Sequence, residues 1–315
     1  MSDLLPDAGL DAPASSPELD SSIERLPARE VSLGQLKIRR VLPVRHRRVI
    51  GPWCFFDRYG PLTFSDGKPM DVAPHPHMGL QTVSWLLDGE VIHHDSLGYE
   101  GLVRPGELNL MTAGRGIAHA EETPPRHSGA LNGVQLWVAL PDSARNTSPS
   151  FQHLSTLPAI ELPGGSAILI IGEMDGLRSG ALAFSPIVGA ELTVHPDSRV
   201  QLPLDPTFEH AVLVLSGDAT IEGAHLEPDT LYYLGTDRDE VQLVSRRGAR
   251  IMLIGGAPFA EPVVMWWNFV ARTAGEIEAA RRDWIEHRRF DDVKAYRGPR
   301  LEAPPLAPHL RSEPR

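Results

Sequence analysis

The chain has 315 residues, more than the ~100–200 of a typical single domain, so we expect two domains. Its 30 Lys and Arg residues face 41 Asp and Glu residues, a formal charge of −11, which argues against direct binding to a nucleic-acid backbone. The single cysteine, Cys54, excludes an intrachain disulfide. It lies in an apolar run, as expected of a buried, inert thiol in a reducing compartment.

Residues 1–28 are acidic, rich in Pro, Ser and Asp, and poor in large apolar side chains. Such a segment cannot offset the entropy lost on ordering, so a disordered tail is predicted. It lacks the basic start and apolar core of a targeting segment, and no apolar span of ~20 residues follows it. We therefore expect a cytoplasmic protein without membrane contact.

From residue 29 onward, short alternating or β-branched runs are separated by Gly, Pro and Asp. This pattern predicts an all-β sandwich or barrel. Asp88-Gly89 marks a tight turn. The predicted strands of the first half include residues 31–33, 36–38, 81–87, 90–93, 108–111 and 134–138.

Residues 141–150 break the strand pattern and are interpreted as the connection to a second domain. The turn at 86–89 resembles the turn at 214–217, an offset of 128 residues, which indicates a duplicated domain. We place the first domain at 29–145 and the second at 150–290. The predicted strands of the second domain include 167–171, 191–194, 211–215, 231–234, 241–244 and 250–254.

Two pairs of polar residues in the first domain have the spacing of metal ligands. His75 and His77 are two positions apart, and so are His119 and Glu121. In an extended strand, side chains at i and i+2 leave the same face. Two such pairs facing each other offer three imidazoles and one carboxylate, which suits a divalent transition metal with open coordination positions. The alternative for each histidine by itself is a surface or packing residue.

The second domain is predicted to keep the barrel and lack the metal. Alignment of the halves places Pro203 and Asp205 where the first has its His-x-His pair, and Gln242 and Val244 where it has its His-x-Glu pair. One metal per chain is therefore expected. The remaining histidines of this half have no partner two positions along and are interpreted as surface or packing residues: His195, His210 and His225.

A helix is predicted to close the second domain and to dock on a barrel. Thr273 and Glu276 have the spacing of a capping box. The apolar face has helical spacing and consists of Ile277, Ala280, Trp284 and Ile285. Residues 291–315 carry Pro and Arg and are predicted to be a loose tail.

Several longer motifs lie along the chain: Gly51-Pro52-Trp53, Phe56-Asp57, residues 75–79, residues 94–98, residues 111–121, and residues 255–258 and 261–263 near the end. Together they resemble the pirin family of the cupin superfamily, over roughly residues 30 to 290. The Met-Thr-Ala-Gly-Arg-Gly stretch at 111–116 is specific to that family.

The resemblance implies a bicupin: two cupin barrels of the double-stranded β-helix, or jelly-roll, type, with a C-terminal α-helix and one mononuclear iron in the N-terminal barrel. Its ligand positions match His75, His77, His119 and Glu121. Fe(II) is favoured, with Mn, Ni, Cu, Co and Zn as alternatives. Met78 and Gln81 stand where the family usually has Arg and Glu, and Gln81 removes a charge expected near the pocket.

The resemblance also implies two kinds of activity. Some members oxidise the flavonol quercetin with O2, which predicts a dioxygenase for a small aromatic or enolic substrate, with Glu121 as the catalytic base. His93 or His94 would orient a ligand, or would be exposed turn residues. Other members are regulatory, so the alternative is a non-enzymatic iron-binding protein that modulates a transcription factor or metabolic enzyme. A sugar or keto-acid isomerase is a weaker third hypothesis, because only Arg104 and Arg115 lie near the motifs. A wide apolar pocket at the metal would favour the enzyme, and a plugged one the regulator.

Overall fold

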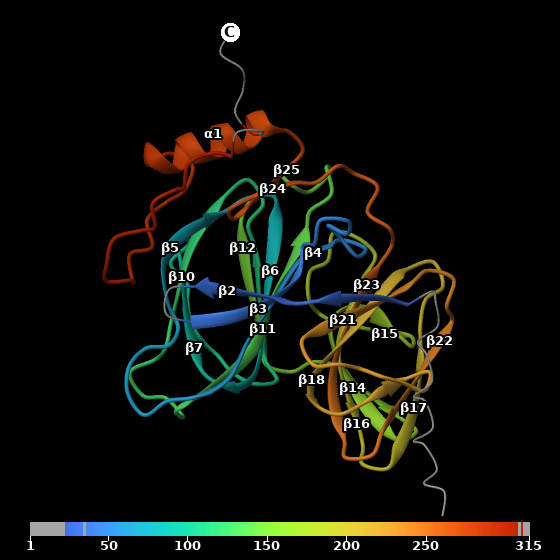
Figure 1. Cartoon of the computed structure of the whole chain (residues 1–315). Helices are drawn as coiled ribbons and strands as arrows, with labels where there is room; N and C mark the ends of the chain where they lie inside the picture. Colours follow the sequence, from blue (N-terminus) through green and yellow to red (C-terminus); the bar gives the residue numbers. More distant parts are fainter. Residues whose placement is uncertain (1–22, 34–35, 308–309, 311–315) are drawn as a thin grey trace, which may run out of the picture.

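The computed structural model describes residues 23–33, 36–307 and 310, which form two β-barrels side by side and one helix (Figure 1). The predicted all-β fold of two cupin barrels with a C-terminal helix is therefore confirmed. Each barrel consists of one large and one small antiparallel sheet. The predicted strands lie in strands of the structure, although Glu90 falls just before one.

The N-terminal barrel pairs a seven-stranded sheet with a four-stranded sheet. The large sheet has the order β12 (Ser150–Leu154), β9 (Leu108–Thr112), β6 (Leu80–Gly89), β11 (Ala130–Ala139), β4 (Trp53–Thr63), β3 (Leu36–Leu42) and β2 (Arg29–Leu33). The small sheet has the order β5 (Asp71–His77), β10 (Ile117–Glu122), β7 (Val91–Asp95) and β8 (Glu100–Val103).

The C-terminal barrel has the same plan. Its large sheet runs β1 (Glu24–Pro27), β21 (Thr230–Gly235), β18 (Glu209–Gly217), β23 (Ala249–Gly256), β16 (Ile187–Val194), β14 (Gly165–Met174) and β13 (Ala159–Leu162), with β15 (Leu177–Arg178) on β14. The small sheet runs β17 (Ser198–Pro203), β22 (Glu240–Ser245), β19 (Thr220–Ile221) and β20 (Ala224–His225). A hairpin of β24 (Val264–Trp266) and β25 (Phe269–Ala271) precedes α1 (Ala274–Ile285).

The two large sheets pack face to face and form the core between the barrels. Alternate residues of β6 and β18 supply much of it, because side chains along a strand point to opposite faces. Trp53 and Trp85 are fully buried there. The Trp53 indole donates to the carbonyls of Val188 and Gly255, and the Trp85 indole donates to the Glu191 carboxylate at 2.6 Å. Each large side chain buried in this way contributes roughly 1.5–3 kcal/mol.

The barrels exchange edge strands, which the predicted domain boundaries miss. Strand β1 precedes the N-terminal barrel in sequence but pairs with β21 of the C-terminal barrel, and Leu26 is 1% exposed. Strand β12 follows the inter-domain connection but pairs with β9 of the N-terminal barrel. The disordered tail predicted for 1–28 is therefore wrong for 23–28, while residues 1–22 lie outside the described part. The start of the second domain at residue 150 is also displaced, because 150–154 complete the first barrel.

The helix begins with the predicted capping box, in which the Thr273 side chain accepts from the Glu276 backbone and the Glu276 carboxylate accepts in return. Ile277, Ala280 and Trp284 are buried as predicted. Ile285 is 49% exposed, so its assignment to the buried face is wrong. The hairpin and the helix lie on the end of the N-terminal barrel, away from the barrel that precedes them in sequence (Figure 1).

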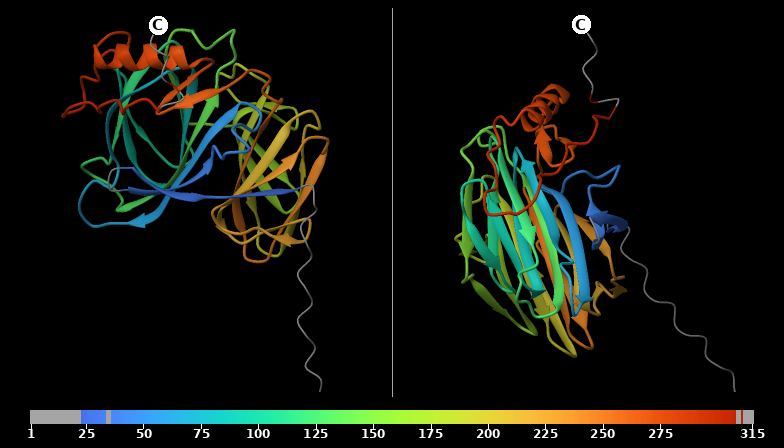
Figure 2. Two further views of the ribbon diagram at one scale, coloured as in Figure 1. Left: turned by 45° about the horizontal axis from the view of Figure 1, so that its top comes forward. Right: turned by 90° about the vertical axis from the view of Figure 1, so that its left-hand side faces the viewer.

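The segment after the helix is packed against the N-terminal barrel, so the loose tail predicted from residue 291 is wrong for the residues described there (Figure 2). The Leu301 amide donates to the Pro74 carbonyl at 2.8 Å, and the Tyr296 hydroxyl bonds to Asp71 at 2.8 Å. The Trp284 indole donates to the Leu301 carbonyl. These contacts hold the segment along the outside of β5. Residues 308, 309 and 311–315 lie outside the described part.

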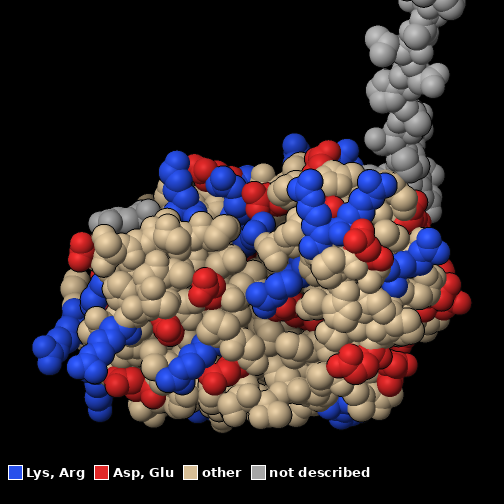
Figure 3. Space-filling model, turned by 90° about the horizontal axis from the view of Figure 1, so that it is seen from below, with Lys and Arg blue, Asp and Glu red and all other residues tan. Residues whose placement is uncertain are grey.

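No helix in the described part of the chain is long and apolar enough to span a membrane. On the face seen in Figure 3, basic and acidic side chains are interspersed, with no continuous basic surface. This agrees with the acidic net charge of −11.

Candidate metal centre

Strands β5 and β10 place the predicted ligands against one another inside the N-terminal barrel. The two strands are antiparallel, with His119 directly opposite His75 and a register shift between His119 and Glu121. The ring centroids of His75 and His77 lie 5.0 Å apart, and that of His119 lies 4.3 Å from His75 and 4.9 Å from His77. The sequence spacing therefore brings three imidazoles together on one face, as expected.

The possible ligand atoms fall into two groups that share His119. His75, His77 and His119 form one group, and His93, His119 and Glu121 form the other, with atoms within 4.8 Å of one another in each. All three predicted histidines meet in a single group, while Glu121 shares a group only with His119 among them. Within the described residues, both groups lie in the N-terminal barrel. The cluster fits a single metal site.

The polar atoms of these histidines support a metal at this place. The Nδ1 of His75 lies 2.9 Å from the Ala73 carbonyl, which leaves its Nε2 for another partner. The Nδ1 of His77 and the Nε2 of His119 are buried without a hydrogen-bond partner among the described residues. A buried polar atom without a partner costs roughly 1–3 kcal/mol, and coordination to a metal ion would remove that cost. Metal-ligating histidines commonly use their second nitrogen as His75 does.

Burial sets the protonation of the cluster. It lowers the pKa of His75 to about 4 and holds the pKa values of His77 and His119 well below 6.5, so these imidazoles are neutral near pH 7. Burial also raises the pKa of Glu121 from 4.5 to about 7. The pKa of Tyr59 is raised mainly by burial and secondly by the charge of Glu121, so the Tyr59 hydroxyl and the Glu121 carboxylate are close. The carboxyl is therefore poised to exchange a proton near neutrality.

His93 and His94 on β7 are buried, so their interpretation as exposed turn residues is wrong. His93 lies directly opposite Glu121, with its Nδ1 3.4 Å from the Nδ1 of His119 and its Nε2 3.4 Å from Asp95. It thus belongs to the second ligand group. His94 points to the other side of the strand, where its nitrogens lie 3.0 Å from Glu100 and 3.2 Å from Glu122.

The large sheet presents an aromatic row to the histidine cluster. Residues directly opposite each other on neighbouring strands share a face, and the row follows such pairs across β4, β11, β6, β9 and β12. The His77 ring lies 5.1 Å from Trp137, and the His93 ring 4.5 Å from Phe151. The members of the row are Phe55, Trp137, Thr82, Met111 and Phe151.

A polar row lies beside the aromatic row on the same inner face. The residues immediately before and after Gln135, Ser84 and Asn109 pack in the core between the barrels. Because side chains alternate along a strand, these three residues face the barrel interior. The members are Arg40, Asp57, Gln135, Ser84, Asn109 and His153, in order across β3, β4, β11, β6, β9 and β12.

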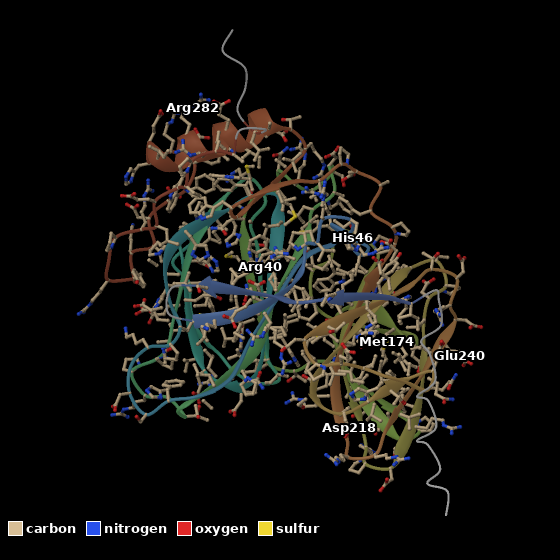
Figure 4. All side chains as sticks on the ribbon, in the orientation of Figure 1. Arg40, His46, Met174, Asp218, Glu240 and Arg282 are labelled. Atoms are coloured by element: carbon tan, nitrogen blue, oxygen red, sulfur yellow. The ribbon has the colours of Figure 1, made fainter. Side chains whose placement is uncertain are left out.

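Contacts within the polar row tie its members together. Arg40 holds Asp57 in a two-pronged ion pair at 2.6 and 2.7 Å, and Figure 4 shows Arg40 over the N-terminal barrel. The hydroxyl of Ser84 donates to Gln135 at 2.9 Å. The Nδ2 of Asn109 is buried and has no hydrogen-bond partner in the part of the chain that the structure describes. Sequence reasoning missed this row, and the only signal was a polar residue in the middle of otherwise apolar strands.

Gly79 lets the hairpin of β24 and β25 close the barrel beside His77. Its φ is +74°, and an added Cβ would lie 2.0 Å from the Val270 carbonyl oxygen. The Val270 amide in turn donates to the Met78 carbonyl at 2.9 Å. Only glycine permits both the backbone angle and this approach.

Met78 faces away from the metal. It packs against Ala118 and Phe269 beneath the helix, and the Arg289 guanidinium donates to its sulfur at 2.9 Å. Where the resemblance leads one to expect an arginine at residue 78, this chain brings one from residue 289.

Gln81 also faces away from the metal, so the expectation that it alters the charge of the pocket is wrong. It is fully buried between the barrels, and its amide donates to the Thr112 hydroxyl and to the Leu182 carbonyl, each at 2.9 Å. Leu182 belongs to the C-terminal half and donates its amide to Gln152 of β12 at 2.8 Å. Gln81 is therefore part of the junction between the two barrels.

Three cavities in the structure lie elsewhere, with volumes of about 1170, 740 and 360 Å³. The largest of the three opens into the C-terminal barrel, the second lies by β3 and β4, and the third lies beneath the segment after the helix. None of them is lined by His75, His77, His119 or Glu121.

Two jelly-roll barrels with a buried histidine cluster in the first define a bicupin protein with one metal site. Comparison with known proteins places the chain within this class. The family model described as Pirin matches residues 35–138, and the Pirin C-terminal cupin domain matches residues 189–291. The chain belongs to the pirin family.

Relatives and solved structures agree with this assignment. A Pseudomonas aeruginosa protein named "Putative quercetin 2,3-dioxygenase" is 45% identical over 90% of each chain. Human Pirin is 32% identical over 79% of this chain and 86% of its own. The crystal structure of a quercetin 2,3-dioxygenase from Acinetobacter baumannii has a TM-score of 0.88 at 42% identity, covering 92% of this chain and 97% of that one.

Proposed function

We propose that the protein is a metal-dependent dioxygenase that oxidises a flavonol, or a related enolic aromatic compound, with O2. The observation that carries the proposal is the buried histidine cluster facing an aromatic row and a polar row inside one barrel. One similar protein is named quercetin 2,3-dioxygenase and another "Putative quercetin 2,3-dioxygenase", which supports the same substrate class. We assign the metal to His75, His77, His119 and Glu121, with Fe(II) favoured.

A divalent metal bound there would supply a positive centre that stabilises an anionic substrate oxygen. The chain supplies the proton acceptor. When its oxygen is not bound to the metal, the Glu121 carboxylate, whose pKa burial raises to about 7 in the metal-free protein, can take the proton of an enolic hydroxyl near neutral pH. His93, between His119 and Asp95, holds the His119 ring in place.

The large sheet would hold the substrate. Trp137 and Phe55 stack face to face at 3.9 Å, and the stack gives the barrel an apolar lining beside His77 against which an aromatic ring system could pack. The polar row offers Gln135, Asn109 and Ser84 to the hydroxyl groups on the rim of such a ring. An unpartnered Asn109 Nδ2 is a donor available for this purpose.

Oxygen uptake with a panel of flavonols tests the proposal. Protein reconstituted with Fe(II) should consume O2 only when a substrate with a free enolic hydroxyl is present. Glu121→Gln, compared at equal measured metal content, should lose on the order of 10²–10⁴ in rate, because the amide cannot accept the proton. Fully iron-loaded wild type that consumes no O2 with any flavonol or enolised diketone would refute the enzyme.

A second function is favoured by one observation, the absence of the His cluster from the linings of the three cavities described above. A closed metal site suits a non-enzymatic iron-binding regulator of a transcription factor or metabolic enzyme. In that case binding of the partner protein should follow the oxidation state of the iron, and no substrate-dependent O2 uptake should occur. Glu121→Gln would then change partner binding only as far as it changes metal content.

A further inference from the structure

The largest of the three cavities described above lies in the C-terminal barrel and has features of a ligand site. Its volume is about 1170 Å³, comparable with the roughly 300–1,000 Å³ of pockets that enclose small organic ligands. It lies between the segment 172–188 and the turn that joins β17 to β18. Figure 4 shows Met174, one of its lining residues, among the strands of this barrel. No step of the proposed dioxygenase uses this cavity.

His210 lines this cavity from the inner face of β18. Its neighbour Ala211 packs in the core between the barrels, whereas Val212 packs in the core of the C-terminal barrel, and alternation places His210 on the same inner side as Val212. The ring is fixed against β23, because a Cβ on Gly255 would lie only 2.7 Å from its Cδ2. The sequence interpretation of His210 as a packing residue accounts for this ring contact but not for the cavity beside it.

The imidazole of His210 is buried and lacks a full set of partners. The residue is 1% exposed, and its buried Nδ1 has no partner in full hydrogen-bond geometry within the described residues, with the Phe208 carbonyl close to the ring. Such a group is costly to leave unsatisfied, by roughly 1–3 kcal/mol. Burial lowers its pKa to about 4, against the opposing influence of Asp205 and the Phe208 carbonyl, so the ring is neutral near pH 7. It therefore offers a neutral hydrogen-bonding group and no positive charge.

The walls around His210 are apolar and the rim is acidic. Met174, Val188 and Leu253 are buried and line the cavity, and the Phe208 ring lies 6.1 Å from the His210 ring. The charged residues that line the cavity are Glu173, Asp175, Asp205 and Arg178. Arg178 forms an ion pair with Glu173, so its charge is already neutralised. An anionic ligand would meet net repulsion here, and a neutral aromatic one would not.

We propose that the C-terminal barrel binds a small neutral hydroxylated aromatic molecule, a phenol, whose hydroxyl group hydrogen-bonds to His210 and whose ring packs between Phe208 and Leu253. This site is separate from the metal centre and does not depend on the proposed dioxygenase activity. The second barrel is thus a ligand-binding module that has no metal ligands of its own in the described residues.

Calorimetric titration of the full chain with 1-naphthol tests the site. Wild type should bind it, and His210→Leu should weaken binding on the order of tenfold, because the ligand hydroxyl loses its partner in an apolar cavity. His210→Gln, which keeps a hydrogen-bonding group, should retain most of the affinity. The matched control is His195→Leu, an exposed histidine of the same barrel outside the cavity, and should bind like wild type. The anion 1-naphthoate should bind more weakly than 1-naphthol.

A variant of the metal centre separates the two barrels. His77→Ala should leave 1-naphthol binding unchanged, since it alters only the first barrel. Loss of binding in His77→Ala, or no binding by wild type up to the solubility of 1-naphthol, would overturn the proposal. If circular dichroism shows that His210→Leu does not fold, Phe208→Ala replaces it, because Phe208 is only partly buried. Unchanged affinity in whichever of these two variants folds would also overturn it.

Discussion

Replacing Glu121 by Gln should remove the pH dependence of metal binding between about pH 5 and 7. In this range the three ligand histidines are already neutral, because burial lowers the pKa of His75 to about 4 and those of His77 and His119 well below 6.5. The one proton left to displace is on Glu121, whose pKa is raised to about 7. Wild-type affinity should therefore fall about tenfold for each pH unit below 7. The Gln variant should bind more weakly at pH 7 but with nearly constant affinity.

The same shift changes the stability of the metal-free protein. A rise in pKa from 4.5 to about 7 disfavours the ionised carboxylate in the fold by up to about 3 kcal/mol. The folded pKa is higher than the unfolded one, so the unfolding free energy of the metal-free protein is highest below pH 4.5, where Glu121 is protonated in both states. It falls by this amount as the pH rises from 4.5 through about 7. Metal-free Glu121→Gln, which cannot ionise, should therefore be more stable than metal-free wild type at pH 8, and the difference should vanish at pH 4.5.

Two measurements check this reasoning. Competition with a chromophoric chelator, using Ni²⁺ to avoid oxidation, gives the affinity at each pH. Urea unfolding of the metal-free proteins at pH 4.5 and 8 gives the stability. Glu122→Gln is the matched control, because this neighbour points out of the barrel toward Lys68 and should keep the wild-type pH dependence. Equal slopes in wild type and Glu121→Gln, or a flat wild type, would refute the assignment of the proton to Glu121.

Three further outcomes follow from contacts described above. Gln81→Glu should destabilise the protein by about 1–3 kcal/mol in urea unfolding, because a carboxylate cannot donate to the Leu182 carbonyl, whereas Gln152→Glu should be tolerated, because its side chain only accepts from the Leu182 amide. His93→Phe should lower metal affinity about 10–100-fold in the chelator assay while the chain stays folded, and unchanged affinity would remove His93 from the site. Leu26→Ala should cost about 2–5 kcal/mol of unfolding free energy, and a negligible cost would mean that β1 does not hold the second barrel.

The sequence by itself determined the strands, the duplication and the three histidines that meet in the buried cluster. These features are local: a period of two identifies a strand, and the same period puts His75 and His77 on one face. The capping box of α1 is equally local, because Thr273 and Glu276 are three positions apart. The longer motifs indicated the family and, through it, the arrangement of two paired barrels.

Only the tertiary structure decided which barrel each edge segment completes. β1 and β12 are short and their sequences do not identify their partners. Their pairing depends on which sheet edge lies within their reach in the folded chain. The segment after residue 291 has few strong apolar runs, yet backbone hydrogen bonds such as that from Leu301 to Pro74 hold it in place. The pattern of side chains in the sequence does not predict such bonds.

The environment of each polar group could likewise not be predicted from the sequence. Met78 and Gln81 lie beside the ligand strand in the chain, but strand alternation and the packing of the two barrels turn both away from the metal. The sequence assigns histidines a pKa near 6.5 and Glu121 a pKa near 4.5, and burial moves the titrating proton from the imidazoles to the carboxyl. Desolvation depends on every atom that surrounds a group, and those atoms come together only in the folded protein.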